Sequence, residues 1–198
     1  MVKLTKNELK KQKDALKRFQ RYLPTLQLKK QQLQMVIRQV EAQYDSVRRR
    51  HETIRKRIDQ WISVFGEEID LTPYVEIERL ETSMGNIAGI DIPVFEDVRF
   101  KDVKWDIVSQ PFWVDEGIQV LRELMTIEAE LAVLKEQLRL LSDELRITTQ
   151  RVNLFEKVKI PETKENIRII RIYLGDQQTA AVVRGKISKR KATGATAW

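Results

Sequence analysis

Residues 26–65 read LQLKKQQLQMVIRQVEAQYDSVRRRHETIRKRIDQWISVF, and apolar side chains recur along them in alternating steps of three and four. The same steps reach back to Leu9, so the series runs for about eight heptads, a repeat that keeps one stripe on one helix face and requires a partner helix. Only Gln12, Lys30 and His51 interrupt the apolar run, whose positions are Leu9, Gln12, Leu16, Phe19, Leu23, Leu26, Lys30, Leu33, Ile37, Val40, Tyr44, Val47, His51, Ile54, Ile58, Trp61 and Phe65.

The ends of this segment carry helix signals. Thr5 and Glu8 have the spacing of a capping box, and Gly66 stands where a left-handed residue ends many helices. Pro24 is expected to kink the helix because it removes a backbone hydrogen bond. Residues 1–65 are therefore predicted to form one long N-terminal helix.

A second apolar series supplies the partner. It comprises Val120, Leu124, Ile127, Leu131, Leu134, Leu138, Leu141, Leu145, Thr148, Val152 and Phe155. We predict a C-terminal helix over residues 114–175, with a kink or break near Pro161 and the stripe resuming at Ile167, Ile170 and Leu174. Residues 176–198 are expected to be a basic tail that is frayed or ordered by a partner. Pairing the two long segments as an antiparallel coiled coil buries both stripes.

The middle of the chain has a different composition. Residues 66–113 hold three of the seven Gly and three of the five Pro, together with short β-branched runs of the kind that form strands and turns. Strands are expected near Val75–Arg79 and over Val98–Trp105, with NIAGIDIPVFE, residues 86–96, between them. The predicted fold is mainly α, a long antiparallel two-helix coiled coil with a small central β-hairpin region.

Composition excludes most chemistry. The chain has 198 residues, no Cys and one His, so thiolate chemistry and most His-based metal sites are ruled out. No P-loop, GxGxxG or HExxH pattern occurs. His51 lies on the helix seam and is interpreted as a tolerated polar core residue, and Trp61, Trp105 and Trp113 as core packing. We expect a protein that is not an enzyme and has no cofactor or metal.

The net charge of +7 is unevenly distributed. Residues 1–65 carry 17 basic and 6 acidic side chains, residues 66–113 carry 4 and 11, and residues 114–198 carry 15 and 12. A helix with a net charge of +11 suits either a phosphate backbone or an acidic or polar protein sleeve. The charged N-terminus and the lack of a long apolar run predict a cytoplasmic protein without a membrane span.

The sequence resembles the D-subunit family of V-type (A/V-type) rotary ATPases, the central rotor stalk. The N-terminal LTKNELKKQKDALKRF is similar to the family's opening. The run LQLKKQQLQ, residues 26–34, is similar to the family's Leu-Lys-Lys-Arg-rich run, with Gln31 in place of its usual acidic residue. Four residues of the middle segment match the family's hairpin, namely Asn86, Ile87, Gly89 and Pro93. RVNLFEKVKIP, residues 151–161, resembles the family's signature at Arg151, Val152, Asn153, Glu156, Ile160 and Pro161. The segment after Gly175 departs from the family pattern.

The resemblance implies a non-catalytic shaft that transmits torque between the A and B subunits of the catalytic head and the membrane ion-carrying ring. It implies partners in the A and B subunits, the F subunit of the central stalk and a d/C-type socket subunit, with no nucleic acid and no direct membrane insertion. ATP hydrolysis or synthesis would thereby be coupled to proton or sodium transport. Besides the hairpin and signature residues, we expect charge contacts from Arg55, Lys56, Arg57, Lys189, Arg190 and Lys191.

Two other classes of protein remain open from the residues alone. Prefoldin-like chaperones also join two helices through a β-hairpin, although their subunits are shorter. A basic coiled-coil nucleic-acid-binding protein would account for the charge of the first helix. The shaft of F-type enzymes is a poorer match, because its central α/β domain needs more than residues 66–113.

Overall fold

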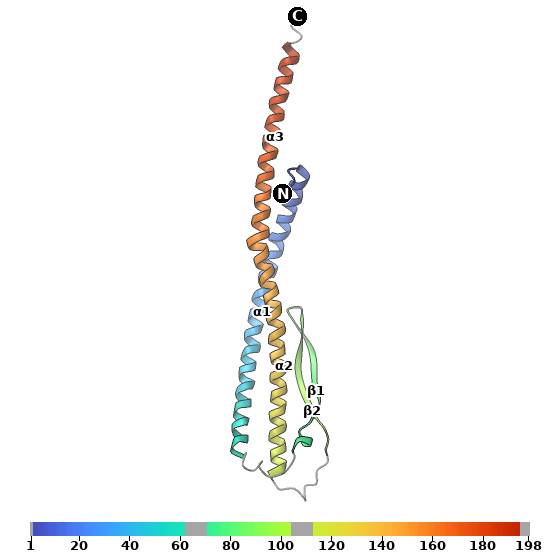
Figure 1. Cartoon of the computed structure of the whole chain (residues 1–198), viewed down its shortest axis with the longest axis vertical. Coiled ribbons are helices and arrows are strands. Elements are labelled where there is room, and N and C mark those ends of the chain that lie inside the picture. Colours follow the sequence, from blue (N-terminus) through green and yellow to red (C-terminus); the bar gives the residue numbers. More distant parts are fainter. Residues whose placement is uncertain (1, 62–70, 104–112, 195–198) are drawn as a thin grey trace. The chain divides into compact units, whose positions relative to one another are not determined.

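The computed structural model describes residues 2–61, 71–103 and 113–194. Its elements are the helix α1, Lys6–Trp61, a short turn η1, Thr72–Tyr74, the strands β1, Ile77–Ile87, and β2, Ile90–Phe100, the helix α2, Trp113–Asn153, a π-helix η2, Leu154–Lys159, and the helix α3, Ile160–Gly194 (Figure 1). Two long helical segments with a small antiparallel hairpin between them confirm the predicted fold class.

The chain divides into two compact units. Residues 30–147, here called the hairpin unit, form one, and residues 1–29 with 148–198, here called the terminal unit, form the other. The predicted helix end at Gly66, the side chain of Trp61 and all of Trp105 lie outside the described residues. Trp113 is half-buried at the first residue of α2.

In the hairpin unit, α1 and α2 bury the predicted stripes against each other. The pairs His51–Glu128 and Arg50–Glu130 show that the two helices run antiparallel, because rising numbers on one meet falling numbers on the other. Every described seam position of α1 and α2 is buried or half-buried, which confirms both apolar series. The fully buried members of the two series are Leu33, Ile127, Leu141 and Thr148. His51 is a half-buried seam residue whose Nε2 lies 3.2 Å from a Glu128 carboxylate oxygen.

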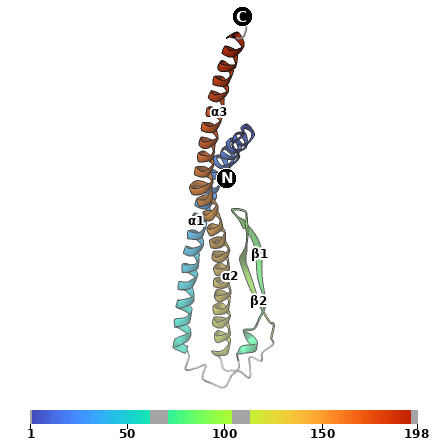
Figure 2. The ribbon, with the colours of Figure 1, turned by 45° about the horizontal axis from the view of Figure 1, so that its top comes forward.

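The β-hairpin lies along α2 in both ribbon views (Figures 1 and 2). Ile92 of β2 is 1% exposed and belongs to the same core as the α1 and α2 stripes. Gln137 of α2 is 6% exposed, and its amide nitrogen donates a 2.6 Å hydrogen bond to the Pro93 carbonyl. At the base of the hairpin, Arg122 donates to the Tyr74 carbonyl and lies over the Phe100 ring. These contacts hold the hairpin on α2.

The strands differ from those expected. The prediction of short strands near Val75–Arg79 and Val98–Trp105 is wrong. The first strand continues as far as Ile87 and the second begins at Ile90, so together they include most of residues 86–96. Pro93 is tolerated because a two-stranded sheet has only edge strands, where a missing N–H costs no ladder bond. Ile90, Ile92 and Val94 alternate along β2, and that alternation is the strand signal in NIAGIDIPVFE.

In the terminal unit, the helix passes Pro161 without ending. The Ile160 N–H donates to the Phe155 carbonyl, five residues back, which is the π-helical pattern. The apolar seam has one step of five residues, from Phe155 to Ile160, where steps of three or four are usual. The π-helix η2 contains one extra residue per turn at this point, and this residue keeps the apolar stripe on one face of the helix. Pro24 likewise lies inside α1.

The segment expected to be a tail that is frayed or ordered by a partner is helical as far as Gly194. α3 continues through Gly175 and Gly185 to Gly194, although almost every residue after Leu174 is exposed. A Cβ added at either glycine would meet no atom within 4 Å. Figures 1 and 2 show this part of α3 continuing past the start of α1.

Replacing Gln137 with Leu tests how the hairpin is attached. The change keeps the side-chain volume but leaves the Pro93 carbonyl without its donor, which costs about 1–3 kcal/mol for a buried group. We expect faster amide hydrogen exchange in β1 and β2, with little change in α1. Gln39→Leu, at an exposed position of α1, is the matched control and should leave exchange in the hairpin unchanged.

Candidate interaction surfaces

The tip of the hairpin is a two-residue turn. Ala88 and Gly89 have φ values of 54° and 78° between the paired residues Ile87 and Ile90, as a type I′ turn requires. The Asn86 side chain accepts a 3.2 Å hydrogen bond from the Gly89 N–H and donates a 2.7 Å bond to Asp91. Asn86 and Gly89 therefore build the turn.

The two other hairpin residues that resemble the family contact the rest of the hairpin unit, one through its side chain and one through its backbone. Ile87 packs against the core of the hairpin unit, and the Pro93 carbonyl accepts from Gln137. The surface of the hairpin is supplied by different residues. Met84 is 73% exposed and Leu80 is 40% exposed, so two large apolar side chains of β1 face solvent.

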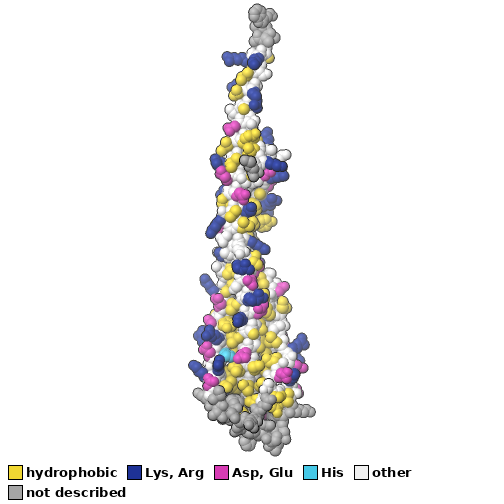
Figure 3. Space-filling model, in the orientation of Figure 1, with side chains coloured by type: hydrophobic (Ala, Val, Ile, Leu, Met, Phe, Trp, Pro, Cys, Tyr) yellow, Lys and Arg dark blue, Asp and Glu magenta, His cyan; other side chains and the backbone are white. Residues whose placement is uncertain are grey.

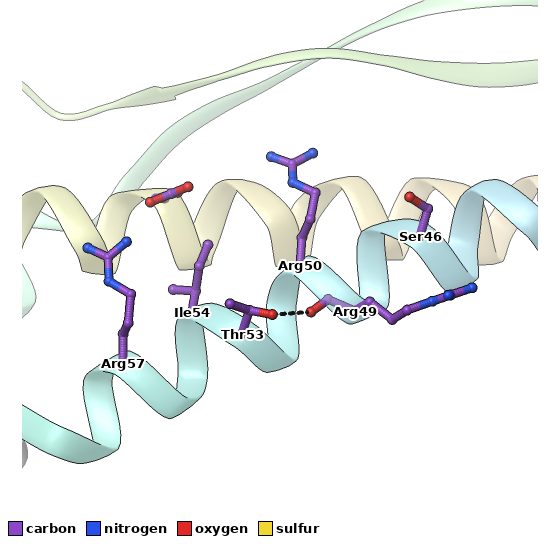
Figure 4. A pocket seen from close by; sticks show the side chains of 7 residues that line it. Ser46, Arg49, Arg50, Thr53, Ile54 and Arg57 are labelled. Atoms are coloured by element: carbon purple, nitrogen blue, oxygen red, sulfur yellow. Dashed lines mark hydrogen bonds between the residues drawn. The ribbon is translucent and has the colours of Figure 1, made fainter.

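An arginine-lined groove runs along α1 in the hairpin unit (Figure 4). Figure 4 shows Arg50, Ile54 and Arg57 rising from α1 on the side that faces α2. Thr53 is held by a 2.9 Å hydrogen bond from its hydroxyl to the Arg49 carbonyl. Glu123 also lines this groove, and Arg50 lies 3.9 Å from Glu130, so acidic side chains balance part of its positive charge.

The predicted contact cluster Arg55, Lys56 and Arg57 is exposed on α1. Among the described residues, none of the three has an ion-pair partner, whereas neighbouring Arg48 pairs with Glu52 at 3.2 Å. Arg57 alone of the cluster lines the groove of Figure 4. The structure thus presents three adjacent cations at successive positions around the helix, none of them ion-paired within residues 2–61, 71–103 and 113–194.

The signature segment divides into a packed side and an exposed side. Phe155 stacks on Phe19 of α1 with ring centroids 5.3 Å apart, inside the terminal unit. Arg151, Asn153 and Glu156 are all exposed. Within the signature, the buried Val152 and Ile160 and the half-buried Phe155 hold α1, and the three polar residues are left for other contacts.

The predicted tail cluster, Lys189, Arg190 and Lys191, is exposed on α3. Two of its carbonyl groups accept hydrogen bonds from the Thr193 hydroxyl. Three apolar side chains earlier in this stretch of α3, Val182, Val183 and Ile187, are each about half exposed. Over the part of the chain that the structure describes, the end of α3 therefore combines exposed cations with an exposed apolar surface.

Sequence reasoning missed a second basic groove, formed in the terminal unit. Its lining comes from α1 and α3 and comprises Lys10, Lys13, Asp14, Leu16, Lys17, Gln20, Lys164, Ile167 and Arg171. Figure 3 shows Lys and Arg side chains spread along the surface of this unit. The signal was present in the spacing of Lys10, Lys13 and Lys17, which places three cations on one helix face rather than around the helix.

Other charges on the same helices are neutralised locally. Arg168 donates a 2.7 Å bond to Glu165, and this hydrogen bond holds the pKa of the Glu165 carboxyl below its ordinary value. Arg139 acts on the pKa of Glu136 in the same way. Within the described ranges, no His, Asp or Glu residues gather into a group able to hold a metal ion. None of the helices the structure describes is long and apolar enough to cross a membrane.

Comparison with known proteins points to one class. The family model for the D subunit of ATP synthase matches residues 8–190. The V-type ATP synthase D subunit of Borreliella burgdorferi is 52% identical over 95% of this chain and 93% of its own length. The corresponding proteins of Chlamydia abortus and Chlamydia pneumoniae are 34% and 32% identical, each over 96% of this chain and over 93% and 92% of their own lengths.

These relatives are all D subunits of V-type ATP synthases, and the matches extend over nearly the whole of each chain. The class of protein is therefore a component of a rotary ATPase. The chain belongs to the ATP synthase D-subunit family. The resemblance stated from the hairpin and signature residues is confirmed.

Changing Gly89 to Ala tests the turn that shapes the hairpin tip. A side chain at φ 78° is strained, so we expect a loss of about 1 kcal/mol of hairpin stability, measured by hydrogen exchange of β1 and β2. Gly175→Ala is the matched control, because that residue lies within α3 and has open space at its Cβ position. It should stabilise α3 by up to about 1 kcal/mol. Unchanged hydrogen exchange of β1 and β2 in the Gly89→Ala variant would contradict the assigned turn.

Proposed function

We propose that this chain is the central rotor shaft of a V-type rotary ATPase and is itself non-catalytic. The observation that carries the proposal is the D-subunit family match over residues 8–190. On this proposal, the shaft transmits torque between a head of A and B subunits and a membrane ring that carries protons or sodium ions. The family match favours the rotor over the chaperone and nucleic-acid alternatives.

The helix pairs supply the mechanical argument. A single α-helix twists easily, whereas two antiparallel helices with interlocking side chains must shear their shared core in order to twist. Both units contain such a pair, with buried seam residues such as Leu33 and Leu141 in one and Ile167 and Ile170 in the other. Two helices packed in this way suit the transmission of rotation.

The terminal unit is proposed to lie inside the A and B head. The last part of α3 exposes Val182, Val183 and Ile187, and a helix without a packed face is marginal in water. A surrounding protein surface would cover these side chains, and Lys189, Arg190 and Lys191 would make charge contacts with it. Residues 1–65 and 114–175 would form the shaft and residues 176–198 the tail in the head.

The hairpin region, residues 66–113, is proposed to dock the lower part of the stalk. Its partners would be the F subunit and the d/C-type socket subunit. Met84 and Leu80 provide an exposed apolar surface on β1, and β1 is paired with β2, which accepts a hydrogen bond from α2. The complex would then lie on the cytoplasmic side of a membrane, with this chain peripheral to it, coupling ATP hydrolysis or synthesis to ion transport.

Co-purification of the full chain with the A, B and F subunits tests the proposal directly. Neutralising Arg55, Lys56 and Arg57 to Gln should weaken assembly or slow ATP-driven rotation several-fold, because these cations have no internal partner among the described residues. A matched variant neutralises the internally paired Arg48, Arg139 and Arg168 and should assemble normally. Wild-type chain that recovers none of the three subunits would refute the rotor assignment.

The apolar surface of the hairpin can be tested by one substitution. Met84→Glu places a charge on the exposed face of β1 without touching the core, so the fold should persist while lower-stalk subunits bind about tenfold more weakly. Thr82→Glu is the matched control, because it adds the same charge at an exposed neighbouring position without removing an apolar side chain. Equal binding by the Met84 variant and wild type would remove the hairpin face from the interface.

A further inference from the structure

The basic groove of the terminal unit runs lengthwise between two antiparallel helices. Phe19 stacks on Phe155, while Lys10 and Lys17 share the groove with Lys164 and Arg171. Residue numbers fall along α1 as they rise towards the end of α3, so the helices run in opposite directions here. The groove has a volume of about 470 Å³, and both helices contribute side chains along its length.

The charge of the groove is strongly one-sided. Lys10, Lys13, Lys17, Lys164 and Arg171 line it, and Asp14 is its single acidic residue. None of the five cations has an ion-pair partner among the described residues, whereas Arg168 and Lys159 pair with Glu165 and Glu162 close by. Five like charges held together with a single counter-charge raise the energy of the free protein and favour an anionic partner.

The floor of the groove is apolar, which narrows the kind of partner. Ile167 is 7% exposed, and Leu16 beside it is half-buried. A phosphate group gains nothing from these side chains, whereas an amphipathic protein helix can place an apolar residue on them and carboxylates on the rim. A groove between two helices has the form that a third helix fills in helix-in-groove recognition.

The spacing of the cations along the groove also matches the repeat of side chains on a partner helix. Lys10 and Lys17 are seven residues apart on α1, and Lys164 and Arg171 are seven residues apart on α3. Seven residues are two helical turns, about 10.5 Å. A partner helix with Glu or Asp side chains at a seven-residue interval presents carboxylates at the same spacing.

We infer that this groove is a docking site for an acidic amphipathic helix of another protein chain. The inference rests on the proposed function only for the identity of that chain, which would be a subunit facing the shaft in the head. The contact consists of carboxylates paired with the five rim cations and one apolar side chain on Leu16 and Ile167.

A synthetic helical peptide is the probe. It has about 21 residues, enough for measurable helix formation, with Glu at a seven-residue interval and Leu on the adjoining stripe. A peptide of the same composition in scrambled order has the same charge without the stripes. Fluorescence anisotropy with the full chain should show tight binding of the first peptide only, weakening between about 50 and about 300 mM NaCl.

The variant K13E/K17E/R171E should bind the peptide about tenfold more weakly, because three exposed ion pairs are lost and each contributes a few-fold. The control K11E/R18E/K186E reverses three exposed cations of α1 and α3 that do not line the groove. It should bind within about twofold of wild type. Circular dichroism should show equal helix content in all three proteins.

Three outcomes would overturn the inference. The first is equal binding of the ordered and scrambled peptides, and the second is an equal loss of peptide affinity in both variants. The third is displacement of the ordered peptide by inorganic pyrophosphate at the same concentration of negative charge, which would indicate a phosphate site. Each leaves the rotor assignment standing if the wild-type chain still co-purifies with A, B and F. Failure of that co-purification, with the peptide result intact, would refute the rotor assignment and keep the groove.

Discussion

The burial of one apolar stripe against another is the interaction on which the structure depends. In each unit, neither helix has another place to bury its seam, so antiparallel pairing is required by the hydrophobic effect rather than by specific polar contacts. Polar seam residues are accommodated individually, as His51 is by Glu128. The exposed faces are free to carry charge, and this freedom is what allows Arg55–Arg57 and the basic groove to exist on the same helices.

The long helices could be predicted from the sequence because their signal is periodic and repeated many times. From Leu9 to Ile58, each described seam position proved buried or half-buried, and the same holds from Val120 to Phe155. The strands were harder to place, because Pro93 and the Gly-containing turn suggested a loop where the edge strands of a two-stranded sheet tolerate both. Local composition could not reveal that α2 supports the hairpin through Gln137.

The candidate sites were predicted less completely, for a physical reason. Motif residues such as Asn86 and Gly89 serve the turn itself, Ile87 packs on the core, and the Pro93 carbonyl accepts from α2. The resemblance therefore pointed to residues that hold the hairpin in shape, and the exposed apolar surface comes from other residues. The basic groove needs side chains from α1 and α3, which are more than 140 residues apart in the sequence. Charge summed along one segment could not show which cations a second helix would bring together.

The π-helix at Leu154–Lys159 has a consequence for how such a chain can change in length. In a regular α-helix, one added residue rotates everything after it by about 100°, which would turn the buried stripe of α3 away from α1. A single wide turn absorbs that rotation within six residues. Insertions and deletions of one residue are therefore permitted at this point of the helix, and the seam on either side keeps its phase.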